Sequence, residues 1–262
     1  DVWLQDLSFR KNKTDVNENG IFDFDTTGYG NDLDGVDLNR NYDFHFEYGG
    51  DATNLNVEDD YHSCGFGEYR SSYDYYRGPS AFSESEVVAI RDFALEKKFI
   101  LSAAYHSSRS GCVSERVIYP WFWDGGKASP DYQVISSLGQ EIAELIPKEE
   151  GDGNYHFAPG GSRNGNAHDW LYAKTGCIQY LIEVGTSNMQ PDNVDLIEDT
   201  ISRNLRGAFH LLKRAAGINF ETGPDKYQVT GVITDESTGQ PLTDVHVKIL
   251  EMDFSRYVKH FG

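Results

Sequence analysis

Apolar residues recur at helical spacing in three long segments, and a fourth, shorter segment has a helix-like end. The first segment opens with a capping box, in which Ser83 precedes Glu86 by three residues. The short segment ends at Gly176, a residue type that commonly terminates helices. The expected apolar faces are Val87, Ile90 and Ala94, then Val134, Leu138, Ile142 and Leu145, then Leu196, Thr200, Leu205, Ala208 and Leu212. The pattern predicts helices over 83–98, 129–145, 168–176 and 191–216.

Short apolar runs alternate with these helices and predict strands at 99–108, 116–123 and 177–185. This alternation is typical of an α/β fold, and we expect a mixed central sheet with helices on both faces. His106 and Glu183 stand near the ends of two of the strands. Ligands of such sheets gather at the carboxyl ends of the strands, so both residues are candidates for a site.

The C-terminal part follows a different pattern. Residues 219–226 resemble a linker, and 227–262 alternate with a period of two around a turn at 236–241. These 36 residues predict the beginning of an all-β sandwich, but they are too few to close one. We therefore expect a large domain at 1–218, a linker at 219–226 and a truncated β domain at 227–262.

Composition narrows the functional classes. With 42 acidic and 23 basic residues the net charge is −19, which argues against nucleic acid as a partner. No apolar run is long enough for a membrane span, and the chain begins at Asp1 rather than Met, as a processed chain or a fragment would. The charge is compatible with a secreted protein. Three cysteines, Cys64, Cys112 and Cys177, allow one disulfide at most.

The stretch "GVDLNRNYDF" (35–44) carries the first candidate chemistry. Arg40 has a planar fork of N–H donors that suits a carboxylate, and the neighbouring amide of Asn39 adds a donor. Taken alone, the tripeptide Asn39-Arg40-Asn41 is more typical of a solvated surface loop.

Several motifs in order resemble the zinc metallocarboxypeptidases, the pancreatic-type carboxypeptidase family. Besides 35–44, these are "YRGPSAFSESEVVAIRDF" (76–93), "LSAAYHSS" (101–108), "RVIYPWFW" (116–123) and "HDWLYAKTGCIQYLIEVGTS" (168–187). The resemblance covers about 215 residues and implies a hydrolase that removes the C-terminal residue of peptides or proteins. It further implies that Asn39 and Arg40 bind the free terminal carboxylate. The segment 229–249 is similar to the start of a transthyretin-like β domain.

The resemblance also implies the catalytic residues. His106 matches a zinc ligand, and Glu183 matches the general base that takes a proton from water. Arg10 matches the residue that stabilises the oxyanion, and Asp37 matches an acid that orients a zinc-binding histidine. His106 and Arg10 have plain structural alternatives, a buried histidine and a surface arginine. Glu183 lies in an apolar strand, where an unpaired carboxylate is costly, so we expect it to have a partner or a function.

The family pattern fails at one place. Its first two zinc ligands lie in an H-x-x-E motif upstream of the Asn-Arg pair, and none of the eight histidines here has Glu three residues later. We expect a chain truncated at its N-terminus, which as given would bind zinc poorly and be inactive. A homologue that has lost its metal is the alternative.

Two further residues match substrate-binding positions of the family. Tyr155 is the nearest counterpart of the family's mobile active-site tyrosine, although it fits a packing residue equally well. His168 occupies the position that lines the specificity pocket, and with Arg163 nearby it suggests a polar or acidic C-terminal residue. A solvated histidine at the start of a helix is the alternative.

A calcium site is a separate hypothesis. Asp15, Asn17, Asn19 and Asp23 surround Gly20 in "DVNENGIFD", which resembles the first half of an EF-hand loop. The twelfth position is Thr26 rather than Glu, so a solvated acidic turn is the alternative.

The sequence thus predicts a secreted, monomeric zinc carboxypeptidase. The alternatives are a cell-wall peptide amidase or endopeptidase, a module that binds peptide C-termini without catalysis, and a calcium-stabilised adhesive protein.

Overall fold

The computed structural model describes residues 9–22, 34–48, 76–107, 115–123, 127–149, 152–160, 165–186, 193–216, 232–243, 245–249 and 254–257. The chain divides into two compact units, Asp1–Leu212 and Lys213–Gly262. The first unit contains the central sheet and the helices, except for residues 213–216 at the end of the last helix.

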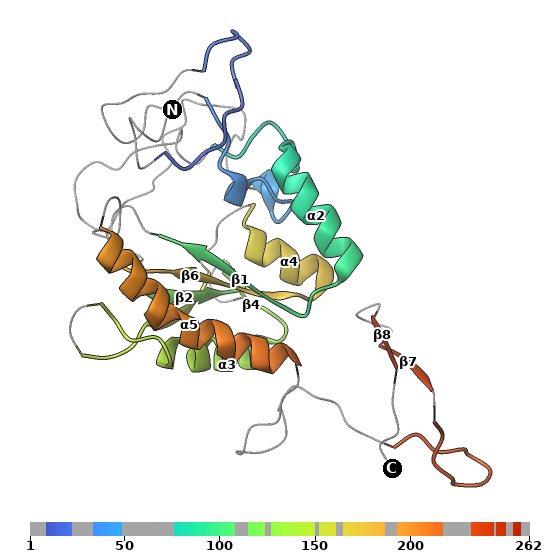
Figure 1. The fold of residues 1–262 in the computed structure, drawn as a ribbon. Coiled ribbons are helices and arrows are strands. Elements are labelled where there is room, and N and C mark those ends of the chain that lie inside the picture. The colour runs from blue at the N-terminus through green and yellow to red at the C-terminus, as the bar shows by residue number, and fades with distance from the viewer. Residues whose placement is uncertain are drawn as a thin grey trace. The chain divides into compact units, whose positions relative to one another are not determined.

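A four-stranded mixed sheet forms the centre of the first unit, in the order β1-β6-β2-β5 (Figure 1). Strand β1 (Leu101–His106) runs parallel to β6 (Ile178–Glu183). Strand β2 (Arg116–Tyr119) is antiparallel to β6 and parallel to β5 (His156–Pro159). The mixed α/β sheet expected from the sequence is therefore confirmed.

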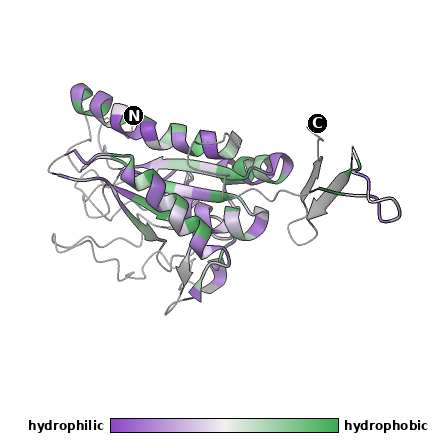
Figure 2. Ribbon diagram, turned by 90° about the horizontal axis from the view of Figure 1, so that it is seen from below, coloured by the Kyte–Doolittle hydropathy of each residue, from purple (hydrophilic) through white to green (hydrophobic). Residues whose placement is uncertain are grey.

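Helices cover both faces of this sheet (Figure 1). Helices α2 (Ser85–Lys97) and α4 (Ala167–Thr175) lie on one face, and α3 (Tyr132–Glu144) and α5 (Val194–Ala216) lie on the other. The strands and the helices both show polar and apolar positions (Figure 2). None of the helices in the described ranges is both long and apolar enough to cross a membrane. The remaining short elements are η1 (Leu38–Arg40), η2 (Phe46–Tyr48), β3 (Phe122–Trp123) and β4 (Lys127–Ala128).

Two hydrophobic cores hold the layers together. Between α2 and α4, aromatic side chains from 42–44 pack on the buried side chains of both helices. Beneath the other face, Gly139 of α3 lets Tyr119 and Tyr180 approach the helix, because an added Cβ would lie 2.9 Å from the Tyr119 ring. The first core comprises Tyr42, Phe44, Val87, Ala94, Trp170, Leu171 and Cys177.

The expected helix start at Ser83 is wrong. Helix α2 begins at Ser85 after Glu84, which makes no side-chain capping bond. The Ser83 hydroxyl instead donates to the Glu84 carboxylate and accepts a hydrogen bond of 2.8 Å from the Asn41 amide. The sequence pattern missed this because Asn41 lies 42 residues away.

The expected apolar faces are correct only in part. In α3, Leu138 and Ile142 are buried, but Val134 and Leu145 are 38% exposed and Ile135 is buried in their place. In α5, Leu205 and Leu212 are exposed, whereas the helix buries Thr200, Asn204, Gly207 and Leu211. The segment 116–123 forms two strands, because Phe122–Trp123 pairs with β4 rather than with the central sheet.

The second unit contains antiparallel pairings. A bridge joins Thr234 to Pro241 around a turn in which the Asp235 carboxylate accepts bonds from Ser237 and Thr238. Strand β7 (His246–Ile249) pairs with β8 (Phe254–Tyr257). The linker at 219–226 lies outside the described residues, so the truncated β domain stays a prediction.

Candidate active site

The ends of two neighbouring strands bring His106 and Glu183 together. They are partners in the register of the parallel pair β1–β6, and the Val184 N–H donates to the His106 carbonyl at 2.7 Å. The Glu183 side chain is buried, and His106 is partly buried. Parallel strands end at the same edge of a sheet, which is why the sequence could place both residues in one site.

Asp37 organises the turn that contains the Asn-Arg pair. It is the N-cap of η1, and its carboxylate accepts a bond of 3.0 Å from the Asn39 N–H. The Arg10 guanidinium lies 3.1 Å from the same carboxylate. The Asp37 carboxylate thus contacts both Arg10 and the turn.

The charges of Arg10, Asp37 and Arg40 act on the pKa of His106. Burial is the largest cause that lowers the pKa of His106 to about 4, followed by the positive charge of Arg10. Asp37 opposes this shift and Arg40 adds to it. His106 is therefore neutral at pH 7, which is the form of histidine that binds metals.

The pKa of Asp37 shifts in the opposite sense to that expected from burial alone. Burial raises the pKa, but the charges of Arg10 and Arg40, with the Asn39 N–H, hold it below its ordinary value. Asp37 is therefore an anion at neutral pH between two arginines.

The Asn-Arg turn is fastened to the start of α4. The Asn39 side-chain oxygen accepts a bond of 3.0 Å from the Ala167 N–H, and Arg40 Nη1 donates to the Asn166 side-chain oxygen at 2.7 Å. Because the amide oxygen of Asn39 is occupied, its NH₂ group is the end that can donate to a carboxylate. Gly165 lies directly against Arg40, since an added Cβ would be 1.8 Å from the Arg40 carbonyl oxygen.

His168 and Asp169 form a buried pair beside this turn. Their exposures are 3% and 0%, and His168 Nε2 lies 3.4 Å from Asp169 Oδ1. An added Cβ at Gly160 would meet His168 Nε2 at 2.6 Å, so the imidazole packs against that loop. Burial raises the pKa of Asp169 to about 8, although Asn166 and Arg40 oppose this. Arg163, the expected neighbour, lies outside the described residues.

Tyr155 is buried, and its hydroxyl contacts the segment that follows β6, the strand that carries Glu183. It is 4% exposed, and its hydroxyl accepts bonds from the Gly185 N–H at 3.0 Å and from Asn204 at 3.2 Å. This position fits the packing alternative rather than a mobile substrate-binding tyrosine.

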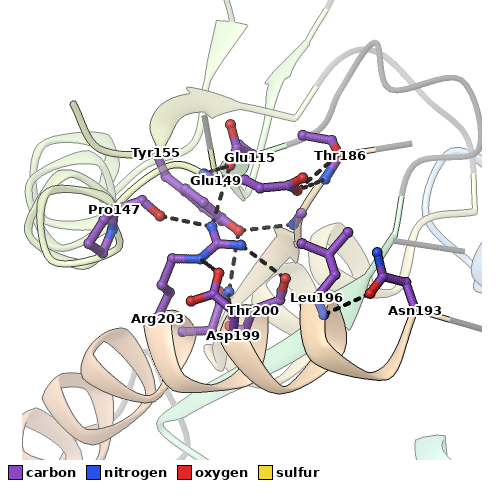
Figure 3. A network of polar contacts seen from close by, with 12 residues as sticks. Glu115, Pro147, Glu149, Tyr155, Thr186, Asn193, Leu196, Asp199, Thr200 and Arg203 are labelled. Carbon is purple, nitrogen blue, oxygen red and sulfur yellow. Dashed lines mark hydrogen bonds and ion pairs between the residues drawn. The ribbon is translucent and has the colours of Figure 1, made fainter. Parts of the chain in front are cut away.

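A polar network continues from Tyr155 (Figure 3). The Glu149 carboxylate accepts bonds from the backbone N–H and the hydroxyl of Thr186, and Arg203 of α5 lies 3.5 Å from Glu115. Arg203 also donates to the Pro147 carbonyl at 3.1 Å. The network therefore joins α5 to the segment that follows β6.

The acidic loop at 15–21 satisfies its oxygens internally. The Asp15 carboxylate accepts bonds from the Asn19 and Gly20 N–H groups, and the Asn19 side chain accepts one from Ile21. Asp23 lies outside the described residues. Calcium binding is not supported by the part of this loop that the structure describes.

Comparison with known proteins identifies the family. Residues 3–206 match the zinc carboxypeptidase family, Peptidase_M14. The chain belongs to this family. Zinc carboxypeptidase A 1 of Anopheles gambiae is 27% identical over 150 residues, which is 56% of this chain and 28% of that protein. The family assignment made from the sequence motifs is therefore confirmed.

A solved structure shows the same fold. Bovine thrombin-activatable fibrinolysis inhibitor, in complex with tick carboxypeptidase inhibitor, has a TM-score of 0.51 at 21% identity, over 82% of this chain and 64% of that chain. Carboxypeptidase A from Helicoverpa armigera has a TM-score of 0.47 at 20% identity, over 70% of this chain and 42% of that chain. The chain thus spans less than two thirds of the length of these relatives.

A zinc site in this family member would need more ligands than the described residues bring together. Within the described ranges, no three His, Cys, Asp or Glu side chains are grouped so that they could hold a metal ion. A catalytic zinc commonly takes three protein ligands, and His106 is the one that the sequence motifs assign. The described residues therefore fit one ligand of a zinc site and do not complete it.

Sequence reasoning missed Asn166 and the burial of Asp169. Both lie within hydrogen-bond networks of Arg40. Asn166 lies outside the motifs that resemble the family, and Asp169 lies within 168–187 but has no role assigned from the sequence. The position of Asn166 immediately before a helix suggests only an N-cap. The contact that distinguishes it, with a residue 126 positions away, is visible only in the folded chain.

Proposed function

We propose that the natural protein containing this chain is a secreted, monomeric zinc carboxypeptidase that hydrolyses the C-terminal bond of peptides or proteins. The observation that carries the proposal is the Asn39–Arg40 turn, fixed on α4 by two side-chain bonds and electrostatically close to His106. A fixed arginine fork beside an amide donor suits a free terminal carboxylate. Family membership supports peptide substrates.

The second group of residues would act at the scissile bond. Glu183 would take a proton from the attacking water and pass it to the leaving amine. Arg10, held by Asp37 at 3.1 Å, would meet the negative charge that develops on the carbonyl oxygen. His106 would give one nitrogen to zinc, a metal that polarises carbonyls and activates water in hydrolases.

His168 would set the preference for the terminal residue. It is buried beside the Asn-Arg turn and packs against Gly160. An imidazole in that place favours a polar or acidic side chain over an aliphatic one, because its N–H group can donate a hydrogen bond to a polar or acidic group.

Zinc content and release of single C-terminal residues test the proposal in the natural protein. We expect one zinc per molecule, and activity that Glu183→Gln abolishes without loss of the metal. Glu141→Gln is a matched control, since Glu141 contacts His210 on the surface at 2.9 Å. Cleavage of amidated peptides as readily as free acids would favour an amidase or endopeptidase. Binding of peptide C-termini without zinc or cleavage would identify a binding module.

A further inference from the structure

Asn39, rather than the N-cap residue Asn166, binds the first N–H group of α4. Asn166 is the N-cap residue of α4, yet its side chain makes no capping bond. Its oxygen instead accepts from Arg40 Nη1 at 2.7 Å. The first N–H of the helix, from Ala167, is satisfied by the Asn39 side chain at 3.0 Å. The Asn-Arg turn and α4 are therefore cross-bonded in both directions.

We propose that Asn166 is a positioning residue that aims Arg40 at the carboxylate of the substrate, and so sets the preference for a free C-terminus. The inference rests on the proposed function of Arg40. Asn166 acts through Arg40 and has no role in the bond-breaking chemistry.

The hydrogen bonds of Arg40 support this assignment. Nη1 donates to the Asn39 carbonyl at 2.8 Å as well as to Asn166, so both acceptors lie on the same end of the guanidinium. A guanidinium is planar, and fixing one nitrogen by two acceptors fixes the direction of the whole fork. A bidentate bond to a carboxylate needs that direction to be set before the substrate arrives.

Asp169 holds the Asn166 amide in the required orientation. Asn166 Nδ2 lies 3.4 Å from Asp169 Oδ2, which turns the amide oxygen toward Arg40. Both side chains are buried, at 3% and 0% exposure, so water does not compete for these contacts. Asp169 thus holds Asn166, the residue that orients Arg40.

The test compares binding of free acids and amides to the whole chain. The probes are N-acetyl dipeptides ending in Leu, Lys or Glu, each as the free acid and as the C-terminal amide, measured by titration calorimetry. Wild type should prefer the acids. Asn166→Ala should reduce that preference at least about fivefold, the equivalent of one hydrogen bond. Thermal unfolding of each variant is measured in parallel.

Asn193→Ala is the control for a purely structural effect. Asn193 caps α5 through a bond of 3.1 Å from the Leu196 N–H, and it is not one of the candidate-site residues. It should lower stability and leave the acid-to-amide preference unchanged. If Asn166→Ala likewise loses only stability, Asn166 is a structural residue and the inference is wrong.

A second variant keeps the test valid if the alanine variant does not fold. Asn166→Gln keeps an amide oxygen as acceptor for Arg40 and an NH₂ group as donor to Asp169, so it should retain more of the acid-to-amide preference than Asn166→Ala. A collapse of the preference in this folded variant would contradict the inference. If wild type itself shows no preference, the proposed function of Arg40 fails, and that outcome is distinct from a failure of Asn166 alone.

Discussion

Asn39 and Arg40 owe their orientation to residues more than 120 positions away. Their side chains bond to Ala167 and Asn166, and neither contact follows from the tripeptide that contains them. The motif therefore predicted that Asn39 and Arg40 could bind a carboxylate, but it did not predict the residues that hold them in place. The same holds for Asp37, whose carboxylate is paired with Arg10 across 27 positions.

Asp169 should make stability depend on pH. Its pKa is raised to about 8 by burial, so between about pH 4 and pH 8 the folded state holds a proton that the unfolded state has lost. The stabilisation that the protonated Asp169 contributes is therefore present at low pH, and it decreases as the pH rises toward 8. Urea unfolding at pH 5 and pH 8.5 should show a larger loss for wild type than for Asp169→Asn, which mimics the neutral carboxyl group. Equal losses in the two proteins would mean that Asp169 is ionised in the fold.

At the scale of elements, the sequence predicted the sheet better than the helix boundaries. Strands β1 and β6 appear where apolar runs placed them, and α4 ends at Gly176 with a positive φ of 75°, as its glycine indicated. These signals are local. The start of α2 depends on Asn41, and the buried face of α5 depends on which side meets α3. Such tertiary contacts leave no trace in a local pattern.

Gly165 should be essential for docking the Asn-Arg turn on α4. It has a positive φ of 72°, and an added Cβ would lie 1.8 Å from the Arg40 carbonyl oxygen. Gly20→Ala is the matched control, because Gly20 has a φ of 80° with nothing within 4 Å of an added Cβ. The control should cost about 1 kcal/mol in free energy of unfolding, from backbone strain alone.

Gly165→Ala should cost more than the control by about 2 kcal/mol or more, because overpacking adds to the strain. It should also weaken binding of N-acetyl dipeptide acids, since the turn must move. Denaturant unfolding and calorimetry measure the two effects. Equal stability losses at both glycines would show that the close contact with Arg40 is absent.

Tyr155→Phe should destabilise the end of β6 without changing recognition of the carboxylate. The change leaves the Gly185 N–H and the Asn204 amide without their shared acceptor in a buried place. We expect a loss of about 1–3 kcal/mol in free energy of unfolding. Tyr105→Phe, at a side chain that is 48% exposed, should change stability by less than about 0.5 kcal/mol. A weakened acid-to-amide preference in Tyr155→Phe alone would instead support a substrate-binding tyrosine.

At the scale of the whole molecule, the candidate site contains two arginines although the chain as a whole is strongly acidic. The net charge is −19, yet Arg10 and Arg40 both act on His106. Long-range fields govern the approach of a peptide and are screened by salt, whereas the paired groups at the site act over a few ångströms. The net charge therefore repels an anionic peptide at a distance, whereas the arginines at the site hold the peptide once it is bound.

This opposition predicts how salt changes association rates. At low ionic strength the acidic molecule should favour N-acetyl-Phe-Lys over N-acetyl-Phe-Glu in the rate of association, because the second peptide carries two negative charges. Raising NaCl from about 20 mM to about 200 mM shortens the screening length from roughly 20 Å to below 10 Å, so the ratio of the two rates should fall toward one. Stopped-flow measurements with both peptides give the ratio, and the neutral-ended N-acetyl-Phe-Leu should lie between them. A ratio that does not change with salt would mean that the local arginines, rather than the net charge, control the approach of the substrate.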